Sequence, residues 1–264
     1  SYLPAMSESL FCAPCHQFSF WGTPIYESYE EWLSSPYAGA GTTCQDCHMP
    51  PTGDVYFALP GQGGLPHPPE QIPSHLQLGA SSVELLQDTV SMTVSAEQIG
   101  DELRVTVAIT NTGAGHHVPT DFPGRHIILT VVAEDGQGQA LPLQDGPIVP
   151  EWGGDQAGLP GQVFAKVLRD VETGEAPVVS YWKQALIVSD NRIPAMGSDT
   201  SIYSFAAPPG IGPVSITADL WFRRTFQAVM DAKGWNDPDI VMARVHSRLD
   251  AGGSDVHPTP SFGP

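Results

Sequence analysis

Two short cysteine motifs constrain this chain more than any other feature. Residues 12–16 read Cys-Ala-Pro-Cys-His and residues 44–48 read Cys-Gln-Asp-Cys-His, so both have the form Cys-x-x-Cys-His. This spacing is the attachment signature of a c-type haem: two thiols form thioethers with the porphyrin, and the imidazole binds the iron. The sequence therefore predicts two covalently attached haems. The attachment and proximal residues are Cys12, Cys15, His16, Cys44, Cys47 and His48.

Three other uses of the cysteines compete with haem attachment. A redox Cys-x-x-Cys pair favours a thioredoxin-like βαβ setting, which this sequence does not indicate. A zinc site with four thiolates does not need a His after each pair. Two disulfides suit an exported protein, but the adjacent His would then be a coincidence in both motifs. The two motifs use all four cysteines of the 264-residue chain, which favours haem attachment.

Charge and hydropathy limit the kinds of partner and the cellular location that we expect for this protein. Eleven basic residues stand against 29 acidic ones, for a net charge of -18, which argues against nucleic acid and against anionic membrane surfaces. No apolar run approaches the roughly 18 residues of a membrane span. No signal peptide is seen, so we expect Ser1 to be a mature terminus. Because haem is attached outside the cytoplasm, we expect an exported protein: periplasmic, cell-surface or extracellular.

The first part of the chain, residues 1–82, is predicted to be a dihaem domain. A capping-box pattern at Ser28 and Glu31 predicts a short helix to about residue 35. Residues 49–73 are rich in Pro and Gly and should be irregular. Two porphyrins can replace the missing apolar core of such a segment. The motifs begin 32 positions apart, at residues 12 and 44, so the two haems should lie near each other in this one domain.

From residue 83 the pattern becomes one of alternating apolar and polar residues, which predicts antiparallel strands. We expect an antiparallel β-sandwich over residues 83–225, and short helices with an extended tail over residues 226–264. The fold class is thus mixed and mainly β: a small irregular and helical dihaem domain, then the sandwich, then short helices. The expected strands are 90–95, 103–110, 127–133, 163–168, 181–188, 201–206 and 214–222. Two C-terminal helices are expected, one that starts near residue 226 and one that spans residues 239–248.

The second ligand of each iron decides what the haems can do, because an iron with two axial ligands transfers electrons whereas an open position allows chemistry. His116 lies in a glycine-lined loop after a strand, which is a suitable place to present an imidazole to a cofactor. His75 lies just before the first strand. We favour His116 and His75, with His117 and His67 as fallbacks. His126 is expected to be structural, whereas His246 and His257 are expected at the surface.

Several segments resemble multihaem c-type cytochromes of the cytochrome c554/c-prime type. The segments are residues 32–38, 44–50, 111–120, 190–194 and 221–224, of which 111–120 contains a Gly-His-x-x-Pro-Thr pattern. The resemblance implies haems with two axial His, and maps the distal ligands onto His116 and His75. This chain differs from such relatives at Tyr37, where they often carry a His, and in having fewer haem motifs. This implies a reduced electron-transfer module.

Three functions remain open at this stage. The first is a dihaem cytochrome for electron transfer outside the cytoplasm, with redox proteins as partners and with self-association or a haem-stacked polymer as an extension. The second is a haem enzyme of the peroxidase or nitrogen-oxide reductase type, in which one iron keeps an open position. The third is a binding module on the β-domain, with Trp152, Trp182 or Trp235 as a platform. We favour electron transfer, which makes the chain a carrier and not an enzyme.

Overall fold

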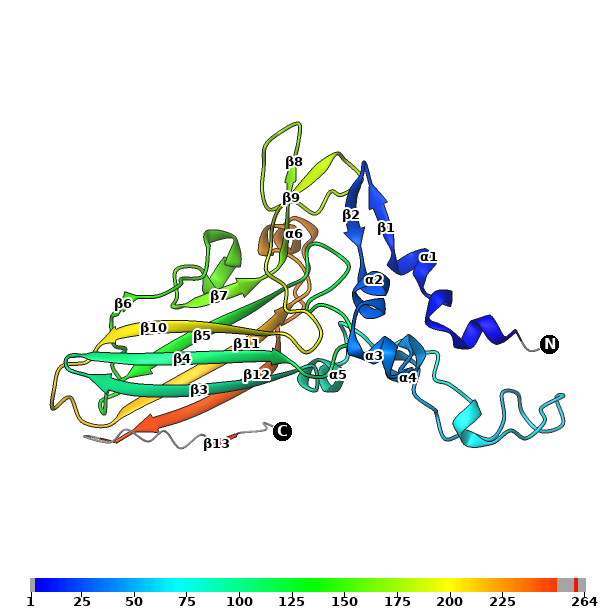
Figure 1. Cartoon of the computed structure of the whole chain (residues 1–264), viewed down its shortest axis with the longest axis horizontal. Coiled ribbons are helices and arrows are strands. Elements are labelled where there is room, and N and C mark those ends of the chain that lie inside the picture. The colour runs from blue at the N-terminus through cyan, green and yellow to red at the C-terminus, as the bar shows by residue number, and fades with distance from the viewer. Residues whose placement is uncertain (1–2, 251–258, 261–264) are drawn as a thin grey trace.

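Two antiparallel sheets dominate the computed structural model, which describes residues 3–250 and the backbone of residues 259–260 (Figure 1). The first sheet has the order β3-β4-β10-β6, and the second has the order β13-β12-β11-β5-β7. The first consists of β3 (Val90–Ile99), β4 (Glu102–Asn111), β10 (Ser198–Ala206) and β6 (Leu143–Asp145). The second consists of β13 (Thr259–Pro260), β12 (Ile240–Leu249), β11 (Val214–Arg223), β5 (His126–Glu134) and β7 (Gly161–Phe164).

One apolar core lies between the two sheets and explains their pairing. Along β4, side chains alternate between buried and half-buried positions over the whole strand, as expected of a strand with one face on the core. Leu103, Val105 and Ile109 of the first sheet and Ile127 and Leu220 of the second belong to the same buried cluster. The predicted mainly β fold with antiparallel pairing is confirmed.

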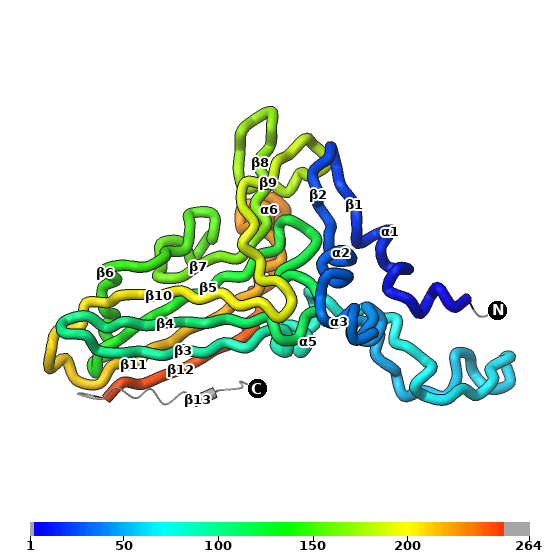
Figure 2. The backbone as a smooth tube through the Cα atoms, viewed as in Figure 1, coloured from blue at the N-terminus to red at the C-terminus, as the bar shows by residue number. Residues whose placement is uncertain are grey.

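The N-terminal segment lies at one end of this two-sheet unit and contains only short elements (Figure 2). Residues 51–73 have one short 3₁₀ turn, Pro69–Gln71, and are otherwise irregular, as predicted. Among the described residues, no helix is long and apolar enough to cross a membrane. The elements are 3₁₀ turns Pro4–Ser7 and Ser9–Phe11, α1 (Ala13–His16), β1 (Phe18–Phe20), β2 (Thr23–Tyr26), α2 (Ser28–Leu33), α3 (Pro36–Gly39), α4 (Cys44–His48) and α5 (Val83–Gln87).

Three smaller elements complete the described chain. A 3₁₀ segment, Glu151–Gln156, precedes β7, and the pair β8 (Lys166–Asp170) and β9 (Ala185–Asp190) forms a separate two-stranded sheet. Helix α6 (Gln227–Lys233) ends at Gly234, which has the left-handed conformation of a helix C-terminus. The helix expected near residue 226 is confirmed.

Three of the predicted elements need correction. The helix predicted at 239–248 is wrong, because this segment is β12, paired with β11 from Val214↔Leu249 to Phe222↔Ile240. A bulge in that ladder shifts the buried positions of β12, which hides the period of two. The strand predicted at 163–168 is two strands in different sheets. The strand predicted at 181–188 begins later, at Ala185.

The predicted capping box of α2 does not form, although the helix does. The residue before the helix, Glu27, makes no side-chain cap, and Ser28 and Glu31 bond to residues far along the chain instead. A capping box is present at α4, where Thr43 and Asp46 bond reciprocally. The tail predicted from residue 250 lies almost wholly outside the described residues, and the domain boundaries near 82 and 225 stay predictions.

His126 is a structural histidine that should make the two-sheet unit sensitive to acid. Its side chain is buried, stacks on Phe226 with ring centroids 5.1 Å apart, and bonds through Nδ1 to the Gly124 carbonyl at 2.9 Å. Burial lowers the pKa of His126 to about 4. Between about pH 6.5, the ordinary His pKa, and about pH 4, this imidazole is therefore protonated in the unfolded chain and neutral in the folded chain.

We therefore expect His126 to remove stability as the pH falls through this window, by about 3 kcal/mol in total. Urea unfolding of the wild type and of His126→Phe at pH 7.5 and 4.5 would measure it. The loss on acidification should be smaller in His126→Phe, and unchanged in the control His246→Phe, because His246 is exposed. Equal losses in all three proteins would contradict the prediction.

Candidate haem site

The two Cys-x-x-Cys-His motifs form the short helices α1 and α4, and these helices adjoin. The backbone N–H of Cys44 donates to Ser9 Oγ at 3.0 Å, and the Gln45 amide donates to the carbonyls of Met6 and Glu8. Burial raises the pKa of the Cys12 thiol to about 11, with a further contribution from its hydrogen bond to Cys44. All four thiols are free. The short spacing of the motifs thus places them side by side, as the sequence predicts.

Three imidazoles share one tautomer. Nδ1 of His16 bonds to Asp121 Oδ2 at 2.6 Å, Nδ1 of His48 to the Leu78 carbonyl at 2.5 Å, and Nδ1 of His116 to the His117 carbonyl at 2.9 Å. Carbonyl oxygens and carboxylates only accept, so each Nδ1 carries the proton and donates. Each Nε2 then keeps its lone pair, which is the form that binds a metal. These three side chains therefore fit a haem iron chemically.

The rings of His48 and His116 lie near each other and are almost parallel. Their ring centroids are 6.1 Å apart and their ring planes differ by only 13°. His116 lies in the loop after β4, and burial lowers its pKa, which keeps the imidazole neutral. A Cβ at Gly115 would lie 3.2 Å from Trp32 and 3.3 Å from Tyr37, so a side chain there would press on both rings. The loop that follows β4 therefore places the His116 imidazole next to His48 of the second motif.

Tyr37 holds the start of the same loop. Its hydroxyl donates to the Thr112 carbonyl at 2.7 Å. Tyr37 stands where the relatives considered above often carry a His, and here it makes this hydrogen bond instead.

A buried ion-pair group fastens the loop to α2. Glu31, whose side chain is 6% exposed, accepts from Arg192 at 2.7 Å, from Thr120 Oγ1 at 2.7 Å and from the His117 backbone N–H at 3.1 Å. Arg192 is 3% exposed and also pairs with Asp190 at 2.7 Å. Removing one partner from such a group leaves an uncompensated buried charge. The hydrogen bonds and ion pair of Glu31 therefore hold the loop that contains His117 and Thr120 in place against α2.

The same loop also reaches the first motif. Asp121 follows the Gly-His-x-x-Pro-Thr pattern directly, and its carboxylate bonds to His16 as described and to Ser28 Oγ at 2.5 Å. The hydrogen bond that His16 donates to the Asp121 carboxylate raises the pKa of His16. One loop of the two-sheet unit thus contacts the histidines of both motifs.

The remaining predicted residues lie apart from this arrangement. His75 is exposed and makes no hydrogen bond, ion pair or ring contact within the described part of the chain. His67 packs edge-on against Phe57, with ring centroids 5.1 Å apart. The His117 ring turns toward Glu31, with Nδ1 3.6 Å from Oε1. His246 is exposed, as expected. His257 lies outside the described residues.

Sequence reasoning missed three residues of the site: Asp121, Glu31 and Arg192. Glu31 was assigned to a capping box, and Arg192 appeared only inside a resemblance. The one available signal for Asp121 was its position directly after the loop pattern. Each contact joins segments more than 80 positions apart, which local spacing does not reveal.

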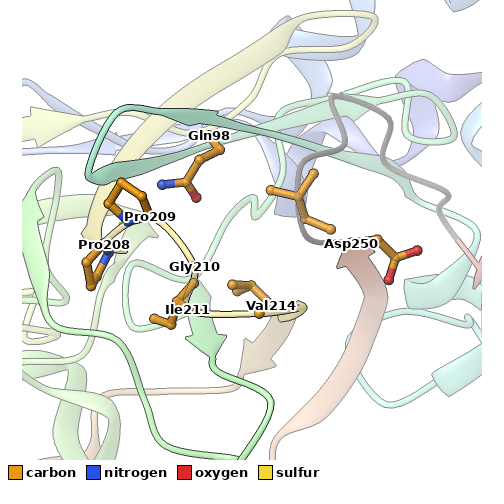
Figure 3. A pocket seen from close by; sticks show the side chains of 9 residues that line it. Gln98, Pro208, Pro209, Gly210, Ile211, Val214 and Asp250 are labelled. Carbon is orange, nitrogen blue, oxygen red and sulfur yellow. The ribbon is translucent and has the colours of Figure 1, made fainter.

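Two cavities are found in the described residues, one far from the histidines of the motifs and one that Glu31 and His117 help to line. A cavity of about 70 Å³ lies at the end of the sheets opposite the motifs, lined by Gln98, residues 208–212, Val214, Leu249 and Asp250 (Figure 3). Another, of about 300 Å³, lies beside α2 and includes Glu30, Ser34 and Pro194. No group of three or more His, Cys, Asp or Glu side chains suited to a metal ion was found among the residues described.

Trp152, one of three tryptophans considered as a binding platform, is half-buried and its ring is engaged within the protein. That ring packs edge-on against His126 and Phe226. Trp182 and Trp235 are exposed, at 59% and 51%.

Comparison with solved structures relates this fold to a larger protein. The chain is similar to a penta-heme cytochrome c552 from Thermochromatium tepidum, with 20% identity and a TM-score of 0.68 over 93% of this chain and 57% of that one. At this identity, the similarity establishes a shared fold. The chain spans little more than half of that cytochrome.

Weaker matches are the human F-spondin reeler domain (16% identity over 53% of this chain and 79% of that one) and a PapD-like domain of human CEP192 (13% over 60% and 84%). Both have a TM-score of 0.21 and carry no weight. No protein-family model and no curated protein matched the sequence.

Proposed function

We propose that this chain is a dihaem c-type cytochrome that transfers electrons outside the cytoplasm. Each haem, when bound, supplies a one-electron Fe(III)/Fe(II) couple. Cys12 and Cys15 would attach the first haem, with His16 on its iron, and Cys44 and Cys47 the second, with His48 on its iron. The shared fold with a penta-heme cytochrome supports this proposal.

The nearly parallel rings of His48 and His116 carry the proposal. A metal–nitrogen bond of about 2.0 Å and an imidazole radius of about 1.1 Å put each ring centroid about 3.1 Å from a metal bound through Nε2. Two imidazoles on opposite sides of one ion then have centroids about 6.2 Å apart. The observed separation is 6.1 Å, with nearly parallel planes. This supports His48 and His116 as the two axial ligands of the second haem.

For the first haem we propose His16 as the proximal ligand and His75 as the distal one. His75 is exposed and makes no hydrogen bond, ion pair or ring contact among the described residues, so its imidazole is available for such a role. The residues after it return to the second motif, where Leu78 bonds to His48. His117 and His67 remain fallbacks, although their rings contact Glu31 and Phe57.

Haem attachment predicts a stepwise change in mass. The wild-type chain made in a host with a c-type haem maturation system should carry two haems that survive denaturation. The double variant Cys44→Ser/Cys47→Ser should carry one, because a porphyrin without its thioethers is lost on unfolding. Intact-protein mass spectrometry after acid denaturation measures both. A wild type that retains no haem would contradict the proposed function.

The alternative is a haem enzyme with one open iron, and the first haem is the candidate for it. No imidazole ring contacts His16 within the described residues. Electronic absorption and EPR spectra of the oxidised and reduced protein, with cyanide and carbon monoxide, decide between the two functions. Two low-spin irons that bind neither ligand support electron transfer. One high-spin iron that binds carbon monoxide on reduction supports the enzyme.

We further propose an exported location with redox proteins as partners, in keeping with haem attachment and a net charge of -18. Two haems span a short distance, so a longer path for electrons requires a partner or further copies of this chain. Electron microscopy of the purified holoprotein tests self-association, and isolated monomers at all concentrations would contradict it.

A further inference from the structure

The two proximal histidines have the same tautomer but unequal acceptors. His16 donates to a carboxylate, that of Asp121, at 2.6 Å, whereas His48 donates to a neutral backbone carbonyl, that of Leu78, at 2.5 Å. Hydrogen bonds to an ionised acceptor are roughly twice as strong as neutral ones. The structure therefore contains an asymmetry at the Nδ1 side of the two imidazoles.

The position of Asp121 indicates a dedicated contact. Its side chain is 6% exposed, against 53% for that of His16. Its second oxygen accepts from Ser28 Oγ at 2.5 Å. Hydrogen bonds donated to both carboxylate oxygens, by His16 and by Ser28, stabilise the ionised form of Asp121. The carboxylate is thus a buried negative charge with both oxygens engaged.

The backbone of Asp121 is also unusual. Its φ is +59°, a left-handed conformation that Asp tolerates better than most residues. This conformation occurs at the one position whose side chain bonds to His16.

A buried carboxylate on Nδ1–H acts on whatever Nε2 binds. It raises the basicity of the imidazole as a ligand. Its negative charge also favours the oxidised, more positive state of the metal over the reduced one, and in a partly buried site this effect is weakly screened. A neutral carbonyl polarises the imidazole less and adds no charge.

We propose that Asp121 is a positioning residue that lowers the reduction potential of the haem at His16 below that of the haem at His48. The two haems are then inequivalent, and the first electron taken up by the chain resides on the haem at His48. This inference rests on the proposed function, since it needs both haems in place.

Spectroelectrochemical titration of the holoprotein with dithionite tests the inference. The wild type should show two separated one-electron steps. In Asp121→Asn the lower step should rise so that the reduction equilibrium of that haem shifts at least tenfold, which is about 59 mV for one electron. The upper step should move much less. In the control Glu30→Gln, which removes an exposed carboxylate from α2, the separation of the steps should stay as in the wild type.

For a second variant, we expect the lower reduction step to shift in the opposite direction. In Ser28→Ala the Asp121 carboxylate loses its other donor and becomes a stronger acceptor for His16, so the lower step should fall further. This variant keeps the His16–Asp121 contact, and it provides a readout even where Asp121→Asn loses haem. The His116→Ala variant assigns the steps, because it perturbs the spectrum of the haem at His48 alone.

Three results would overturn the inference: equal movement of both steps in Asp121→Asn, movement of the upper step alone, or a rise of the lower step in Ser28→Ala. Failure of the proposed function looks different. It appears in the wild type, as fewer than two attached haems or as a high-spin iron. Two low-spin haems with the steps unaffected by these variants would leave the proposed function intact and refute the role of Asp121.

Discussion

Replacing His116 with Ala should convert one of the two irons from low spin to high spin. Carbon monoxide binding by the reduced protein should rise from none to one equivalent per chain. The reason is that the rings of His116 and His48 lie at the separation of two axial ligands, with 6.1 Å between their centroids. EPR of the oxidised protein and titration of the reduced protein with carbon monoxide measure the change. Added free imidazole should restore the low-spin signal.

The neighbouring residue provides the matched control. His117→Ala removes an imidazole that turns toward Glu31 and keeps the backbone N–H that Glu31 accepts. It should leave both irons low spin. The reverse pattern, an open iron in His117→Ala and none in His116→Ala, would show that the ligand has been assigned to the wrong histidine.

His75→Ala should open the other iron, so that His75→Ala and His116→Ala together bind two equivalents of carbon monoxide. If His75→Ala leaves both irons low spin, the first haem takes its distal ligand from elsewhere. The same titration serves for both variants.

Replacing Arg192 with Leu should destabilise the folded chain by about 3–5 kcal/mol, because Glu31 would keep a buried charge without its partner. The loss should be visible as a lower urea midpoint, followed by tryptophan fluorescence. Glu31 also accepts from Thr120 and the His117 backbone. We therefore expect the loop that carries His116 to loosen, and a high-spin signal to appear at lower urea than in the wild type.

Two comparisons make the effect of Arg192 specific. Arg104→Leu removes an exposed cation whose carboxylate partners are 3.5 and 3.6 Å away, and should cost under about 1 kcal/mol. The double variant Arg192→Met/Glu31→Gln should recover part of the loss, because it removes the isolated charge and keeps an acceptor for the loop. No recovery in the double variant would mean that packing, and not charge, dominates at this position.

The strands show where sequence patterns suffice. The alternation in residues 90–95 and 103–110 predicted β3 and β4, because each has one face on the core and one toward solvent. In β12 the bulge opposite Leu220 and Trp221 shifts the buried positions, so that Ile240, Val241 and Val245 imitate helical spacing. Its true state depends on pairing with β11, which no local window contains.

The sequence alone predicts the chemistry that depends on residues lying close together along the chain. The two Cys-x-x-Cys-His motifs predict two attachment sites, and the alternation of apolar residues predicts the mainly β, antiparallel fold. Both signals are local: the thioether geometry spans five residues, and a strand repeats every two.

The surroundings of the imidazoles, in contrast, follow from the three-dimensional packing of the chain. This packing sets His116 against His48, bonds His16 to Asp121 across 105 positions, and joins Glu31 to Arg192. The physical reason is that these contacts depend on where one loop of a sheet stands relative to a short helix. That placement is fixed by the packing of the two-sheet unit and by a buried ion pair, and neither leaves a periodic trace in the sequence.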